Sequence, residues 1–347
     1  MSNAFFKISR FRIFFMIVVG VLFTWSFLYS FLSHRVIKYS QARVLLGTLV
    51  QIHICAAPQE KHTVLQAFDQ AWKRLEEINT RINVYNEQSD IAAINRSYPH
   101  PIKVHRDVYE LLALSKRYHA LTQGAFDITI WPLIVLWKEA QTKQALPLPG
   151  DIKWAKEAMG VDKIKLLADH YVQLMHARTR IDLSAIGQGY AADEAAAILR
   201  KEGMKNFLID AGGEVMAQGL NDKGRPWSVG VKDPLQPMQM IDIIPVADRA
   251  VSTSGDYEKY YEINQKKYSH IIDPVTGYPT NSVVSATVVC SNATEADVFS
   301  TVLCVLGKQG IKLLESLSPG VAMAVIEQNL DQATSLYQNN AYQVMTR

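Results

Sequence analysis

The longest uncharged apolar run of the chain lies near its N-terminus, from Ile13 to Leu32. At about 1.5 Å per residue, a helix of this length spans about 30 Å, which is the thickness of the hydrocarbon core of a bilayer. Basic residues flank the run on both sides, and no small-x-small cleavage site follows it. We therefore predict an uncleaved signal anchor, whose orientation the flanking charges leave open. The expected order is a cytoplasmic N-terminal segment (1–12), a transmembrane helix (13–32), a tether (33–42) and a globular domain (43–347).

The composition of the chain fits a globular domain behind that anchor. Hydrophobic residues make up 48 % of it, which is enough for a large core. The net charge is only +3, and Lys and Arg are scattered, so the sequence predicts no nucleic-acid partner. Cys55, Cys290 and Cys304 form no CxxC or Cys/His spacing, which argues against structural zinc and a disulfide framework.

Helical and strand periods are mixed along the chain without a regular βαβ order. The spacing of apolar residues predicts helices over 62–78, 107–121, 131–140, 190–202, 293–306 and 309–317. β-Branched and alternating segments predict strands over 44–56, 206–210, 226–231, 241–246, 267–273, 283–290 and 321–327, and a hairpin within 163–183. This mixture predicts the α+β class, with a single domain of largely antiparallel sheets and packed helices.

The segment RIDLSAIGQGYAA, from Arg180 to Ala192, contains a GxGxxA pattern after a strand-like stretch. That pattern is typical of dinucleotide-binding turns. Here it follows a hairpin and precedes antiparallel-looking strands, and Asp182 and Ser184 are unusual in a buried parallel strand. We therefore expect a tight turn that feeds a helix N-terminus and not an NAD-binding Rossmann enzyme. Such a helix start can still hold phosphate through backbone N–H groups.

Asp297 and Thr301 are four residues apart in a predicted helix, with Ser300 beside them. Residues four apart share one helix face. A carboxylate and a hydroxyl are hard oxygen ligands that Mg²⁺ accepts when phosphates and water complete its shell. Asp and Thr are also common near helix starts as caps or solvated residues. The pattern alone leaves both interpretations open.

Three further segments combine polar residues with turns or apolar runs. Asp127 lies in the apolar run GAFDITIWPLIVLW, and a buried carboxylate needs hydrogen bonds, so it serves either the fold or a site. DAGGE, residues 210–214, indicates a turn or a close backbone approach to a ligand. YSHIIDPVTGYPT, residues 268–280, places His270 among Pro and Gly turn signals. This rigid corner would hold His270 in one geometry, and its unperturbed pKa near 6.5 suits a general base.

Seven blocks follow one another between Leu45 and Gly307. In order they are LLGTLVQI, VYNEQSDIAAIN, GAFDITIWPLIVLW, IDLSAIGQGYAAD, STSGDYEKYY, SHIIDPVTGYP and EADVFSTVLCVLG. Together they resemble the ApbE family of flavin transferases, which move FMN from FAD onto a threonine or serine of another protein. The ordered set is more specific than any single block. The resemblance implies that 43–347 is an ApbE-like flavin transferase domain.

The resemblance also implies a set of site residues. As FAD contacts it implies Leu46, Tyr85, Ala125, Phe126, Asp127, Asp182, Gln188 and Ile272. As Mg²⁺ ligands it implies Asp297, Ser300, Thr301 and, through its backbone carbonyl, Ala185. Leu46 stands where the family usually has methionine, and Gln188 stands where Lys or Glu is frequent. His270 is the candidate catalytic residue.

The activity implied by this resemblance is Mg²⁺-dependent transfer of FMN from FAD to a Thr or Ser hydroxyl of an acceptor protein, with release of AMP. The alternatives are an FAD pyrophosphatase that forms FMN and AMP, and a non-catalytic flavin-binding protein tethered to the membrane. The expected partners are flavoprotein subunits of membrane electron-transport complexes. The expected location is the bacterial cytoplasmic membrane, with a single membrane pass and the catalytic domain in the periplasm.

Overall fold

The computed structural model describes residues 15–16, 36–236, 238–255, 259–329 and 333–346. The predicted anchor over 13–32 and the segment before it lie outside these residues, apart from Phe15 and Met16. Within the described ranges, no helix is long and apolar enough to cross a membrane. The anchor therefore stays a prediction.

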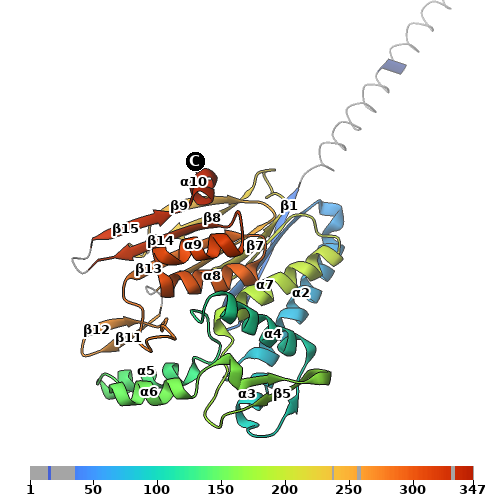
Figure 1. Ribbon diagram of the computed structural model, residues 1–347. Coiled ribbons are helices and arrows are strands. Elements are labelled where there is room, and N and C mark those ends of the chain that lie inside the picture. Colours follow the sequence, from blue (N-terminus) through green and yellow to red (C-terminus); the bar gives the residue numbers. More distant parts are fainter. Residues whose placement is uncertain (1–14, 17–35, 237, 256–258, 330–332, 347) are drawn as a thin grey trace, which may run out of the picture.

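An eight-stranded antiparallel sheet forms the centre of the molecule (Figure 1). Its strands, in spatial order, are β1 (Ile37–Leu45), β2 (Thr48–Ala56), β6 (Phe207–Ala211), β7 (Glu214–Gln218), β10 (Arg249–Gly255), β13 (Val283–Cys290), β14 (Ala322–Gln328) and β15 (Thr334–Gln338). Every residue of β13 is buried. Its Val- and Ala-rich sequence suits a strand that is covered on both faces.

Each face of this sheet has its own cover. One face carries α2 (Lys61–Ile82), α7 (Ser184–Lys201), α8 (Ala293–Leu306) and α9 (Lys308–Leu317). The other carries the hairpin of β8 (Trp227–Lys232) and β9 (Met240–Val246), together with α10 (Asn340–Met345). On the helical side α7 packs directly against α8.

The remaining elements lie beyond these helices. α3 (Asp90–Arg96), α4 (Arg106–Leu121) and the small sheet of β3 (Ile102–Lys103), β5 (Tyr171–Leu174) and β4 (Ile164–Leu166) extend the main core. α5 (Trp131–Lys143), α6 (Pro149–Glu157) and the hairpin of β11 (Tyr260–Ile263) and β12 (Lys266–Ser269) share a separate small core. Short 3-10 helices cover Pro58–Glu60, Val161–Lys163 and Ala168–His170. The predicted α+β class with antiparallel sheets is confirmed.

The prediction of a tether over 33–42 is wrong from Ile37 onward. β1 begins there and pairs with β2 along its whole length. Most of β1 is exposed at the edge of the sheet, so its sequence lacks the apolar alternation by which strands are recognised. Leu46 and Gly47 form the connecting turn with positive φ angles of 55° and 73°, which suits a two-residue hairpin. Leu46 therefore lies in a turn and not within a strand.

The expected tight turn in the GxGxxA pattern is also wrong. α7 begins at Ser184, so Gly187 and Gly189 lie inside the helix. Residues 180–183 before it form no strand. This local structure and the antiparallel central sheet exclude a Rossmann arrangement. The strand predicted over 267–273 likewise ends early, because β12 stops at Ser269.

Candidate functional site

Helices α7 and α8 come into close contact at Gly189. A Cβ atom there would lie 2.3 Å from the carbonyl oxygen of Ala293 and 2.8 Å from Cβ of Asp297. Glycine permits this approach, and the Gly189 N–H donates to Oδ2 of Asp297 at 2.9 Å. Asp193 of α7 accepts from the backbone N–H groups of Ala293 and Thr294, both at 2.8 Å. We call this contact the α7–α8 junction.

The junction contains two buried acidic side chains. Asp297 is 4 % exposed, and burial raises its pKa to about 7. Glu214, the first residue of β7, is buried as well. Burial and the neighbouring Asp297 raise the pKa of Glu214 well above its usual range. Two buried carboxyl groups that lie close together favour their protonated forms in the cation-free protein, and a bound cation would favour the carboxylate forms instead.

Ser300 contacts strand β10. Its hydroxyl is 2.9 Å from Oγ of Ser252 and 2.8 Å from Oγ of Ser254, both on β10. It also donates to the backbone carbonyl of Asp297 at 2.9 Å. These contacts occupy the hydrogen-bonding positions of a hydroxyl. Ser300 thus anchors α8 to β10, and its role as a metal ligand stays a prediction.

The other predicted metal ligands lie at the junction. Ala185 precedes Gly189 by one turn of α7, and Thr301 follows Asp297 by one turn of α8. In a regular helix the Ala185 carbonyl faces the Gly189 N–H, and that N–H donates to Asp297, so the carbonyl lies at the turn that the Asp297 carboxylate contacts. The described part of the chain has no cluster of three or more His, Cys, Asp or Glu side chains that could hold a metal ion. A cation here therefore depends on carbonyl and hydroxyl oxygens as well.

Asp182 lies just before the N-terminus of α7. Its N–H donates to the carbonyl of Ile128 at 2.8 Å, and its Oδ1 accepts from the N–H of Ser184 at 2.9 Å. Burial raises the pKa of Asp182, whereas the positive charge of Lys138 acts in the opposite direction. Asp182 therefore lies at the same end of α7 as Ala185.

Lys138 of α5 joins two aromatic rings near this end of α7. Its Nζ donates to Oη of Tyr85 at 2.8 Å. It also lies 5.1 Å from the ring centre of Tyr85 and 5.3 Å from that of Trp131. The two rings meet edge to face with centroids 5.6 Å apart. Since Tyr85 is 70 % exposed, this cation and its two rings form an aromatic platform that a planar ligand can reach.

The loop that carries Asp127 packs into the protein. Oδ1 of Asp127 accepts from the N–H and the hydroxyl of Thr129 at 2.7 and 2.6 Å. Ala125 and Phe126 are both buried, and the Phe126 ring belongs to the main core. The Phe126 N–H donates to Oγ1 of Thr122 and its carbonyl contacts Nδ1 of His119, so its contact with FAD stays a prediction. The same loop carries the Ile128 carbonyl that holds Asp182.

Leu46 and Gln188, two predicted FAD contacts, meet each other. Nε2 of Gln188 on α7 donates to the carbonyl of Leu46 at 3.2 Å. The N–H of Leu46 donates to Oδ1 of Asn79 on α2 at 3.1 Å. The β1–β2 turn is therefore held between two helices. Because Gln188 precedes Gly189, this turn lies next to the α7–α8 junction.

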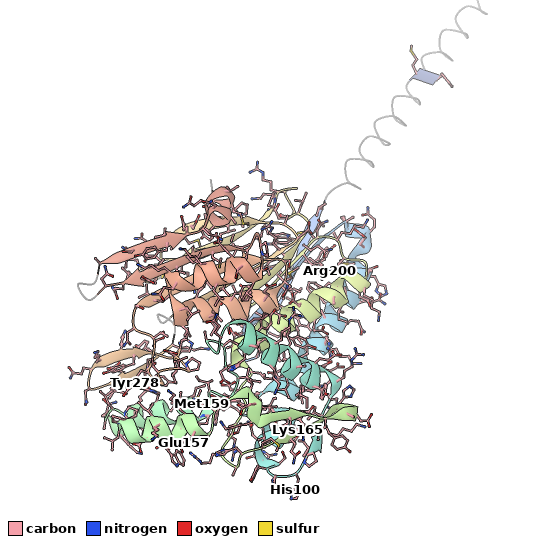
Figure 2. All side chains as sticks on the ribbon, viewed as in Figure 1. His100, Glu157, Met159, Lys165, Arg200 and Tyr278 are labelled. Atoms are coloured by element: carbon pink, nitrogen blue, oxygen red, sulfur yellow. The ribbon has the colours of Figure 1, made fainter. Side chains whose placement is uncertain are left out.

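The segment 270–280 is a closed loop. Ile272 forms a bridge with Pro279, and the N–H of Gly277 donates to the carbonyl of Asp273 at 2.8 Å. The indole N–H of Trp137 donates to the Gly277 carbonyl at 3.0 Å. Tyr278, labelled in Figure 2, lies between the β11–β12 hairpin and helices α5 and α6. The loop is thus fixed to the small core, as its Pro and Gly residues predict.

His270 enters this loop from β12 and is half-buried. Its Nδ1 is 2.9 Å from the carbonyl oxygen of Lys259. A carbonyl only accepts, so Nδ1 carries the proton and the basic lone pair lies on Nε2. This tautomer suits a general base.

The sequence model described as the ApbE family matches residues 46–325. The chain belongs to the ApbE family. ApbE relatives named FAD:protein FMN transferase include that of Salmonella typhimurium, 33 % identical over 272 residues that cover 76 % of this chain and 77 % of the relative. The relative from Treponema pallidum is 30 % identical over 304 residues, which cover 83 % and 84 %. The family predicted from the seven blocks is confirmed.

Solved ApbE structures have the same fold. The flavin transferase ApbE from Vibrio cholerae superimposes with a TM-score of 0.77 and 25 % identity, covering 89 % of this chain and 99 % of that one. The ApbE protein from Thermotoga maritima gives a TM-score of 0.79 and 28 % identity, covering 90 % and 100 %. The shared fold therefore covers about nine tenths of this ApbE chain and nearly all of each solved chain.

Two residues near the ApbE site were not assigned from the sequence. Glu214 ends the segment DAGGE, where an acid beside two glycines was the available signal. Lys138 directly follows the block GAFDITIWPLIVLW. Glu214 lies near Asp297, and Lys138 contacts Tyr85. Both arrangements depend on contacts between segments far apart in the chain.

Replacing Asp182 with asparagine should stabilise the FAD-free protein at neutral pH. Burial raises the folded-state pKa of Asp182 above the ordinary 3.8. The folded protein therefore keeps a proton that the unfolded chain has released, and raising the pH above about 4 favours unfolding. The Asp182→Asn variant lacks this penalty and keeps an acceptor for the Ser184 N–H.

Urea unfolding at several pH values measures this effect. The stability advantage of Asp182→Asn should be smallest near pH 4 and grow as the pH rises toward the folded-state pKa. An advantage that does not change with pH would contradict the explanation by burial.

Proposed function

We propose that this chain is an enzyme that transfers FMN from FAD to a Thr or Ser hydroxyl of an acceptor protein. The α7–α8 junction is the observation that carries the proposal, because a buried carboxylate there contacts the first turns of a long helix. Such a helix start suits a diphosphate. Membership of the ApbE family and the names of its curated relatives support the same reaction.

The oxygen atoms at the junction fit Mg²⁺, which we include in the proposal. Asp297 offers a carboxylate, Thr301 a hydroxyl and Ala185 a backbone carbonyl, all of them hard ligands. Oε2 of Glu214 is buried without a hydrogen-bond partner among the described residues. An orphaned buried oxygen beside a buried carboxylate is expected where a cation completes the charge balance. Bound there, Mg²⁺ would offset charge on the diphosphate and on the departing AMP.

The surrounding residues suit the two ends of FAD. The positive end of the α7 dipole favours the negatively charged diphosphate. The aromatic platform of Tyr85, Trp131 and Lys138 suits a flat isoalloxazine ring. Asp182 lies between these two features and offers an acceptor for polar groups of the nucleotide.

His270 performs the proton transfer in this proposal. Nε2 accepts the proton of the acceptor hydroxyl while the hydroxyl oxygen attacks the phosphorus of the FMN half of FAD. A P–O bond to the acceptor forms, the P–O bond to AMP breaks, and AMP leaves with the bridging oxygen. The hydrogen bond from the Trp137 indole N–H to the Gly277 carbonyl keeps the 270–280 loop, and hence the His270 imidazole, in one position.

The partners and location form part of the same proposal. The apolar run from Ile13 to Leu32 supports a membrane tether. A domain tethered in this way would meet acceptors that are themselves membrane-bound, which supports flavoprotein subunits of electron-transport complexes. We place the catalytic domain in the periplasm on the resemblance to bacterial ApbE proteins.

Incubation of the protein with FAD, Mg²⁺ and a candidate acceptor subunit tests the function. Flavin fluorescence that stays with the acceptor after denaturing electrophoresis, with equimolar AMP in solution, is the expected result. Free FMN and AMP without labelled acceptor would instead identify a pyrophosphatase. Bound but unchanged FAD would identify a flavin-binding protein without this activity.

A further inference from the structure

We propose that Glu214 supplies a second carboxylate to the divalent cation held at Asp297. The proposal rests on the Mg²⁺-dependent transfer proposed above. It adds a residue that lies outside the seven sequence blocks of the family resemblance.

The first observation is the unsatisfied state of the Glu214 side chain. Glu214 is 6 % exposed. Its Oε1 is 3.5 Å from Oγ of Ser252, at the limit of a hydrogen bond. Its Oε2 is the one buried side-chain nitrogen or oxygen in the described part of the chain without a hydrogen-bond partner. A glutamate with a purely structural role would be expected to have both oxygens satisfied.

The second observation is the position of Glu214 beneath the α7–α8 junction. Strand β7, which it begins, contacts both α7 and α8. Oγ of Ser252 is 2.9 Å from Oγ of Ser300, and Ser300 lies between Asp297 and Thr301 in the sequence of α8. A short polar chain therefore leads from Glu214 to the helix that carries the proposed metal ligands.

The third observation is the acidic character of the groups that act most strongly on Glu214. Among the described residues, the ionisable groups with the largest effects on it are Asp297 and Asp210. Asp210 is already occupied, because its Oδ1 accepts from the N–H groups of Gly212 and Gly213 at 3.0 and 2.9 Å. A divalent cation would neutralise Glu214 and Asp297 together and give Oε2 its missing partner.

Binding of Mn²⁺, used as a probe for Mg²⁺, tests this role without reference to activity. Calorimetry and the EPR signal of free Mn²⁺ give the affinity of the full chain with and without FAD. Glu214→Gln should weaken binding about tenfold or more, and Glu214→Asp should keep part of the affinity because it keeps the charge. Glu295→Gln is the matched control. Glu295 lies on α8 and accepts a hydrogen bond from Asn292, and it is not a proposed metal ligand. Its replacement should leave the Mn²⁺ affinity unchanged.

Thermal unfolding separates this role from a structural one. Without a divalent cation, Glu214→Gln should melt no lower than wild type, because glutamine has the size of glutamate and carries no ionisable group to bury. Added Mn²⁺ should raise the melting temperature of wild type more than that of Glu214→Gln.

The possible outcomes are distinct. Equal Mn²⁺ affinity of wild type and Glu214→Gln overturns the role of Glu214 and leaves the proposed transferase intact. Failure of wild type to bind Mn²⁺, even with FAD present, overturns the cation site itself. If Glu214→Gln does not fold, the comparison of wild type with Glu214→Asp decides, and unchanged affinity of Glu214→Asp overturns the proposal.

Discussion

Replacing Asp297 with asparagine should lower the rate of FMN transfer by about a hundredfold or more. The substitution removes the charge that holds the proposed cation but keeps an oxygen that can accept from the Gly189 N–H. The fold should therefore survive. The initial rate of acceptor labelling at saturating FAD and Mg²⁺ measures the effect, and circular dichroism verifies the fold.

Glu295→Gln provides the control for Asp297→Asn. It changes the net charge by the same amount on the same helix, yet Glu295 is only half-buried and interacts with the helix cap Asn292. The rate at which Glu295→Gln labels the acceptor should match that of wild type. Equal rates for Asp297→Asn and wild type would refute the metal role of Asp297, and an equal fall in both variants would indicate a general charge effect.

Replacing Gly189 with alanine should destabilise the protein by about 1–3 kcal/mol. The added methyl group would lie 2.3 Å from the Ala293 carbonyl oxygen and 2.8 Å from Cβ of Asp297, so α7 and α8 must separate. That separation also lengthens the hydrogen bond from Gly189 to Asp297, so labelling should slow as well. Urea unfolding monitored by tryptophan fluorescence gives the change in the free energy of unfolding.

Gly150→Ala is the matched control for Gly189→Ala. Gly150 also lies in a helix, α6, and beyond its chain neighbours and its own helix backbone a Cβ atom there would meet no heavy atom within 4 Å. This variant should be as stable as wild type or more stable by up to about 1 kcal/mol. If the two alanine variants had the same stability, close packing at the junction would not be what requires glycine.

The helices with strong apolar periodicity were predicted well. α8 has the predicted bounds, Ala293–Leu306, and α2 extends the predicted helix by a few residues at its ends. α2 buries one face against the core, and local spacing records that burial directly, whereas α8 is buried on most of its sides. The blocks that carry the family resemblance were recognisable for a similar reason, because each is a continuous segment.

Short or unusual strands were not predicted. β1, β7, β10 and β15 have no clear counterpart among the predicted elements. β1 is mostly exposed, and β7 is mostly buried, so neither shows the alternation of a strand with one buried face. Their pairing with strands distant in sequence stabilises them, and local patterns contain no information about it.

By itself, the sequence determined the α+β class, the family and the candidate residues on α8 and in the 270–280 loop, because these follow from local periodicity and continuous motifs. Only the tertiary structure decided which side chains meet. It turned Ser300 toward β10, and it brought Lys138 to Tyr85. It also buried Glu214 beneath the junction of Asp297 and Gly189. The physical reason is that burial and electrostatic coupling depend on distances between segments that chain order alone does not specify.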